Sequence, residues 1–150
     1  MEKLIFPLIA GLGATATISI LVWINTMDED CMWVIAPFGA TTVLVFGAPY
    51  NPMAQPKNVI LGHLLTAFIG LVTLKFFGVT PTSLAVSVGI SLAAMLITQT
   101  MHPPAGGNPL IIMLTGQDWQ FMITPILIGV CVIVLFGRIV RWCREKYRYV

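Results

Sequence analysis

The chain has 150 residues, of which 57% are hydrophobic and only 9% are charged. A soluble domain carries about 25% charged residues, so this composition excludes a soluble enzyme or nucleotide-binding domain and indicates one integral membrane domain. The formal net charge of +2 conceals a segregation, because five of the eight basic residues stand in the last thirteen positions. A basic segment beside a spanning helix normally stays cytoplasmic, so we expect this one to set topology and to bind no nucleic acid.

The predicted elements follow from apolar length, since about 20 residues cross the hydrocarbon core as a helix. In the first half we expect a span over 4–25, an acidic loop over 26–32, an apolar segment over 33–50 that Pro37 and Gly39 interrupt, a polar loop over 51–58 and a span over 59–79. In the second half we expect a span over 82–101, a break over 102–109, a short apolar run over 110–115, a polar turn over 116–120 and a last span over 122–142. Each half therefore reads as helix, broken short element, helix.

A proline and glycine pattern occurs twice at an offset of 67 residues. The offset relates Pro37 to Pro104, Gly39 to Gly106, Gly62 to Gly129 and Gly70 to Gly137. A duplicated break inside apolar sequence is typical of transporters and channels. We therefore expect an all-α membrane protein with two pseudo-symmetric repeats, at about residues 4–79 and 82–142, and a basic cytoplasmic tail at 143–150.

Two topologies remain open. If both broken elements cross, the chain has six membrane segments and its repeats are inverted; if both re-enter, it has four full spans and parallel repeats. Crossing places Lys57 on the cytoplasmic side with the basic tail, which the positive-inside bias favours. We predict six segments, two of them short or re-entrant, in a bacterial inner membrane with both termini cytoplasmic.

The two breaks hold the residues that we expect to bind a ligand. A helix that starts inside the membrane leaves its first N–H groups free, and its macrodipole adds partial positive charge, which together favour an anion. The candidate residues are Pro37, Gly39, Ala40, Thr41 and Thr42 in the first break and His102, Pro103, Pro104, Gly106, Gly107 and Asn108 in the second. In the alternative interpretation, both breaks are tight loops at the membrane surface, capped by threonine or asparagine.

The remaining charges agree with an anion path. No acidic residue falls inside a predicted span, whereas cation pathways usually present carboxylates or carbonyl rings. Lys75 is the strongest candidate for a buried charge, although it could also extend to the interface from its helix end. His63 and His102 could titrate near neutral pH and so couple proton movement to anion movement; alternatively, His63 is an ordinary interfacial residue.

Other classes of site lack a pattern. Two histidines make a poor metal site, and the three cysteines are far apart with no metal-ligand spacing, so we expect no metal, no cofactor and no disulfide. No nucleophile–base arrangement is visible, so we expect no enzyme. Small residues at four-residue spacing predict close helix packing, which is the role that we assign to Gly62, Gly70, Gly89 and Gly129.

The segment 102–109, His-Pro-Pro-Ala-Gly-Gly-Asn-Pro, resembles the signature of the HPP family of integral membrane proteins, and segments 36–41 and 48–58 are also similar to that family. The similarity extends from about residue 4 to residue 141. The resemblance implies a membrane protein, usually described with four spanning helices, that transports. Members from plant chloroplasts and cyanobacteria are associated with nitrite transport, which makes nitrite the first expected substrate.

We therefore predict a transporter or channel for a small monovalent anion, nitrite before nitrate, formate or chloride. The alternative is a membrane scaffold or assembly subunit without flux, which the small-residue stripes and the basic tail would serve equally well. The short chain favours a homo-oligomer in the bilayer.

Overall fold

The computed structural model describes residues 2–27 and 32–147, and the regular elements in these ranges are helical. The longer helices are α1 (Glu2–Met27), α2 (Ala36–Gly47), α3 (Pro56–Phe77), α4 (Pro81–Ile97), α5 (Asn108–Thr115) and α6 (Ile128–Tyr147). The short elements are the 3-10 turns η1 (Pro52–Ala54), η2 (Pro103–Gly107) and η3 (Trp119–Met122) and the π-helical η4 (Ile123–Leu127). The predicted all-α class is confirmed, while the acidic run 28–30 and Cys31 lie outside the described residues.

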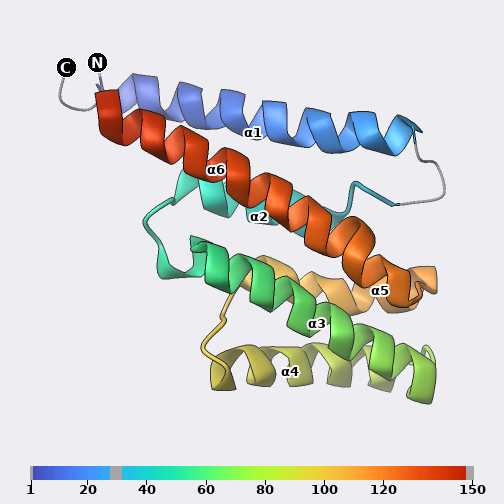
Figure 1. Cartoon of the computed structure of the whole chain (residues 1–150). Coiled ribbons are helices and arrows are strands. Elements are labelled where there is room, and N and C mark those ends of the chain that lie inside the picture. The colour runs from blue at the N-terminus through green and yellow to red at the C-terminus, as the bar shows by residue number, and fades with distance from the viewer. Residues whose placement is uncertain (1, 28–31, 148–150) are drawn as a thin grey trace.

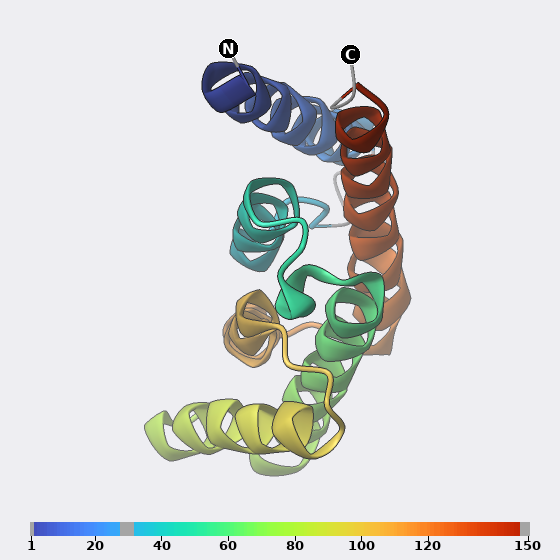
Figure 2. The same cartoon turned by 90° about the vertical axis from the view of Figure 1, so that its left-hand side faces the viewer.

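Successive helices run in alternating directions along one common axis (Figure 1), so that the start of α1 and the end of α6 lie at the same end of the molecule. Seen along that axis (Figure 2), α1 and α4 lie at opposite edges, and the short helices α2 and α5 lie between them beside α6 and α3. α1 packs on α2 and α6, whereas α4 packs on α3 and α5. Three helical stretches are long and apolar enough to cross a membrane: Ile5–Met27, Pro56–Phe77 and Trp119–Lys146.

Prolines mark where these helices begin. Pro37, Pro56, Pro81 and Pro109 each occupy the first or second position of a helix. The proline ring sets φ to a helical value, and its missing N–H removes a donor that the first turn would leave unpaired. The sequence breaks are therefore helix starts, and the 3-10 turn η2 leads directly into α5.

The predicted last span differs from the structure. It was expected as one helix from residue 122, but the backbone leaves the helical region at Thr124, with φ −125° and ψ 109°, and α6 begins only at Ile128. The cause is Pro125, because a proline ring cannot be accommodated in a helix interior without a kink. α6 then extends to Tyr147, so that residues 143–147 of the predicted tail are helical.

Two glycines let the second break approach α3 closely. A Cβ added at Gly62 would stand 3.0 Å from the carbonyl oxygen of Thr100 and 3.0 Å from His102 Cβ, and one at Gly70 would stand 2.8 Å from Pro109 Cα. Two glycines of α6 do the same for the first break: a Cβ at Gly129 would meet the ring of Phe38, and one at Gly137 would meet Val45. These are four of the six glycines that the 67-residue offset pairs; at the other two, Gly39 and Gly106, a Cβ would meet nothing within 4 Å. Gly89 differs, because a Cβ there would meet nothing within 4 Å.

We expect Gly129→Ala to destabilise the protein by about 1–3 kcal/mol, the usual range for overpacking a core, because the ring of the fully buried Phe38 has no space to retreat. Gly89→Ala is the matched control, since alanine is the better helix former and meets open space there. Thermal unfolding of both variants in detergent checks this. An equal melting temperature for the two variants would contradict the close-packing role of Gly129.

Candidate functional site

Five polar side chains meet inside the helix bundle, each with no exposed surface. They are Thr41 of α2, His63 and Thr66 of α3, His102 immediately before η2, and Asn108 at the start of α5. Burial of polar groups in a membrane protein is costly unless they bond to one another, so their mutual geometry matters. We call these five residues the buried cluster.

The hydroxyl of Thr41 joins the two histidines. Its Oγ1 lies 2.8 Å from His63 Nε2 and 2.9 Å from His102 Nε2. His102 Nδ1 lies 2.7 Å from the carbonyl oxygen of Met53, which can only accept, so Nδ1 carries the proton. In the neutral ring, His102 Nε2 must then accept the single hydroxyl proton of Thr41.

The direction of the remaining bonds follows from that assignment. Since the hydroxyl proton of Thr41 is used, Oγ1 accepts from His63 Nε2–H, and His63 Nδ1 becomes an acceptor. Asn108 Nδ2 stands 2.9 Å from His63 Nδ1 and donates to it. The result is one continuous chain of donors, from Asn108 through His63, Thr41 and His102 to the carbonyl of Met53.

Asn108 has more acceptors around its amino group than it has protons to give. Besides His63 Nδ1, its Nδ2 lies 3.1 Å from the His63 carbonyl oxygen and 3.0 Å from Thr66 Oγ1. Its Oδ1, in contrast, is buried without a hydrogen-bond partner in the described chain, and so is the hydroxyl of Thr42. Most buried side-chain polar atoms have a partner, so these two atoms retain hydrogen-bonding capacity for a polar solute.

The walls of the buried cluster come from both breaks. The Phe38 ring meets the His63 ring edge-on with centroids 5.8 Å apart, and the two histidine rings lie 5.1 Å apart. The breaks also touch each other, since a Cβ added at Gly107 would stand 3.1 Å from Pro37 Cγ.

The structure brings only some of the predicted site residues together. Thr41, His63, His102 and Asn108 form the chain, and Pro37 and Gly107 form the contact between the breaks. Gly39, Ala40 and Pro103 are exposed on the described chain, while Pro104 and Gly106 are half-buried. Lys75 is also exposed, 12 residues beyond His63 and hence about 18 Å along α3.

Several backbone amides of the breaks are already engaged. The N–H of Phe38 donates to the Ile35 carbonyl oxygen at 2.9 Å, and Ala40 and Thr41 lie inside α2, whose own hydrogen bonds use their N–H groups. In the second break, Pro103 and Pro104 have no N–H, the N–H of Ala105 donates to the carbonyl oxygen of His102 at 3.0 Å, and the N–H of Asn108 donates to the Ala105 carbonyl. A ligand would therefore find fewer free amides than the sequence suggests, and the buried side-chain groups are the stronger candidates.

Sequence reasoning missed two members of the site. Thr66 stands one turn after His63 within the small-residue stripe of α3, so that stripe was its only signal. The carbonyl of Met53 belongs to η1, a turn that the pattern predicted only as loop, and nothing in the sequence singles it out.

Comparison with known proteins agrees with this architecture. The HPP transmembrane-region family matches residues 3–150. This chain belongs to the HPP family. Two transmembrane proteins of Dictyostelium discoideum are 29% and 28% identical to it over 99% of its length. The HPP chain spans about half the length of these relatives, 55% and 50% respectively. No solved structure matches. The family resemblance is thus confirmed, and the chain is an integral membrane protein.

We expect Thr41→Val to cost about 1–3 kcal/mol of stability, because it leaves one buried imidazole N–H of this HPP protein without an acceptor. Thr41→Ser keeps the hydroxyl and should retain most of the stability. Thr73→Val is the matched control, since the largely buried hydroxyl of Thr73 bonds only to the Ile69 carbonyl of its own helix. Thermal unfolding in detergent measures the series, and equal losses for both valine variants would show that Thr41 contributes no more than a local helix bond.

Proposed function

We propose that this HPP protein carries a small monovalent anion across the membrane, with nitrite as the first substrate, and that the buried cluster is a station on the path. The observation behind the proposal is the histidine–threonine–histidine chain between the two breaks. Ionisable residues inside membrane segments are rare and usually mark ion or proton pathways. Nitrite comes from the family resemblance, through members of plant chloroplasts and cyanobacteria.

The charge distribution supports an anion rather than a cation. Among the described side chains, the carboxylates are those of Asp118, in the turn after α5, and Glu145, near the end of α6. Neither is part of the buried cluster. An anion at Asn108 would therefore meet donors and titratable imidazoles without a nearby carboxylate to repel it.

Protonation of His63 would convert the site to an anion binder. In the neutral cluster, Asn108 turns Nδ2 to His63 and leaves its oxygen free, which repels an anion. A proton on His63 Nδ1 makes that atom a donor, so the amide must rotate by 180° and present Oδ1 to it. The rotation turns the amino group toward the position where Oδ1 stood and gives up its bond to the His63 carbonyl oxygen, while the Thr66 hydroxyl can reorient to donate to Oδ1. Anion and proton then bind together, and the transported unit is neutral.

The proposed topology has six segments in two inverted halves, α1 to α3 and α4 to α6. It is supported by the alternating helix directions (Figure 1). It is also supported by glycine contacts between the halves: a glycine of α3, in the first half, contacts α5, and glycines of α6, in the second half, contact α2. We further propose a homo-oligomer in a bacterial inner membrane with both termini cytoplasmic.

Flux into liposomes containing the purified protein tests the function. We expect nitrite uptake by the wild type, accompanied by one proton per nitrite, and weaker uptake of nitrate, formate and chloride. Asn108→Leu should reduce nitrite uptake at least tenfold, because a lost hydrogen bond to a charged group costs about 1.5–3 kcal/mol. Thr73→Val serves as the folded control with retained uptake. Absence of flux for all four anions in folded wild-type protein would favour the scaffold alternative.

Thiol labelling tests the topology. In a background with Cys31, Cys131 and Cys143 replaced by serine, single cysteines at positions 57 and 118 are probed with an impermeant reagent in sealed vesicles. Because Lys57 begins α3 and Asp118 follows α5, six alternating segments place these positions on opposite sides. Labelling of both from one side would rule out the six-segment arrangement.

A further inference from the structure

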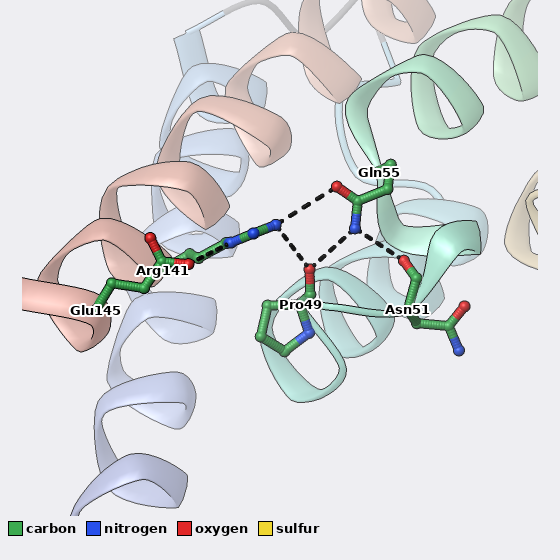
Figure 3. Close-up of polar contacts among 5 residues, drawn as sticks. All are labelled: Pro49, Asn51, Gln55, Arg141 and Glu145. Carbon is green, nitrogen blue, oxygen red and sulfur yellow. Dashed lines mark hydrogen bonds and ion pairs between the residues drawn. The ribbon is translucent and has the colours of Figure 1, made fainter. Parts of the chain in front are cut away.

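Three arginines of α6 differ in their partners. Arg144 lies over the ring of Phe6 in α1, with its guanidinium carbon 3.7 Å from the ring centroid. Arg141 pairs with Glu145 at 2.9 Å and reaches the carbonyl oxygen of Pro49 at 3.4 Å and Gln55 Oε1 at 3.5 Å (Figure 3). Arg138 is exposed and makes no hydrogen bond or ion pair with the rest of the described chain.

Arg138 stands in an apolar stripe. Leu135, Arg138, Ile139 and Trp142 follow the spacing i, i+3, i+4, i+7 and therefore share one face of α6. Leu135 and Trp142 are each 58% exposed, so this face is turned away from the bundle and toward the bilayer. Inside such a stripe the charge of Arg138 has no partner from its own helix face.

The stripe forms one wall of an open groove of about 800 Å³. Gln55 and Pro56, at the start of α3, line the groove together with Arg141 and Glu145. Glu145 is paired with Arg141, so the two arginines and one carboxylate leave a net charge of +1 in the groove. The groove thus combines one unpaired guanidinium with an apolar surface that faces lipid.

We propose that this groove is a binding site for an anionic phospholipid, with the phosphate on Arg138 and the first part of an acyl chain along Leu135 and Ile139. A guanidinium matches phosphate oxygens in geometry and charge, and a headgroup supplies the partner that Arg138 lacks. Trp142 stands where an aromatic ring marks the interface between hydrocarbon and water. The site does not depend on transport by the buried cluster.

The surroundings favour a lipid over a free phosphate ion. Half of the groove wall is apolar and turned toward the bilayer, which a small hydrated ion does not use. Lys57, Arg144 and Lys146 lie near the same end of the bundle, and basic residues near a membrane surface attract anionic headgroups. One net positive charge fits a headgroup with one negative charge, such as that of phosphatidylglycerol.

Native mass spectrometry of detergent-solubilised protein with equimolar phosphatidylglycerol and phosphatidylcholine tests the proposal. We expect the wild type to retain phosphatidylglycerol in about tenfold preference. Arg138→Gln should lower its affinity for phosphatidylglycerol about fivefold, as expected when one basic residue near the headgroups is lost. Arg138→Lys should lose less affinity than Arg138→Gln, because it keeps the charge but not the paired donors of the guanidinium.

Lys57→Gln is the matched control, because it removes one charge near the same end but outside the groove wall. Equal losses for Lys57→Gln and Arg138→Gln would show a diffuse surface attraction and overturn the proposal. Equal retention of the two lipids by the wild type would overturn it as well. Displacement of phosphatidylglycerol by millimolar inorganic phosphate would identify a free-phosphate site instead of a lipid site.

Discussion

A single hydroxyl group, bonded to two buried imidazoles, is the constraint on which the arrangement of this protein depends. Thr41 has one proton to donate, and His102 takes it because the Met53 carbonyl has already fixed the other ring nitrogen as a donor. His63 must then donate to Thr41 and accept from Asn108. Because no water in the bilayer core can replace a lost partner, the segments that carry these residues must stay in register.

Prolines and glycines make this register achievable. Prolines stand in the first turn of α2 and of the second break, where their missing N–H leaves one unpaired amide fewer, so that helices can start beside the buried cluster. Gly62 and Gly70 then let α3 lie against the second break at backbone distance, and Gly129 makes room for the Phe38 ring that covers His63. The sequence pattern at an offset of 67 residues thus marks contacts that the buried cluster needs, and within the cluster it relates Thr41 to Asn108.

The sequence predicts the helices and both breaks well, because apolar length and proline position depend on local chemistry. It also identifies Thr41, His102 and Asn108 as candidates, since they lie in the breaks. It cannot show that His63 is fully buried beside them, because hydropathy does not fix the rotation of a helix about its axis. The expected role of free amides depended on where each helix starts, and α5 begins at Asn108 rather than at Pro104.

The buried cluster and the groove on α6 meet at one short turn. The Met53 carbonyl of η1 accepts from His102, and Gln55, two residues later, lies within reach of Arg141. The turn is held by its own bonds, since Asn51 Oδ1 accepts from the N–H of Met53 at 2.8 Å. Gln55 Nε2 also donates to the Asn51 carbonyl at 3.0 Å (Figure 3). The contact of Arg141 and the acceptor that sets the tautomer of His102 therefore belong to the same hydrogen-bonded turn. In this architecture only the three residues 53–55 connect the carbonyl that accepts from His102, inside the bundle, to the side chain that contacts Arg141 of α6.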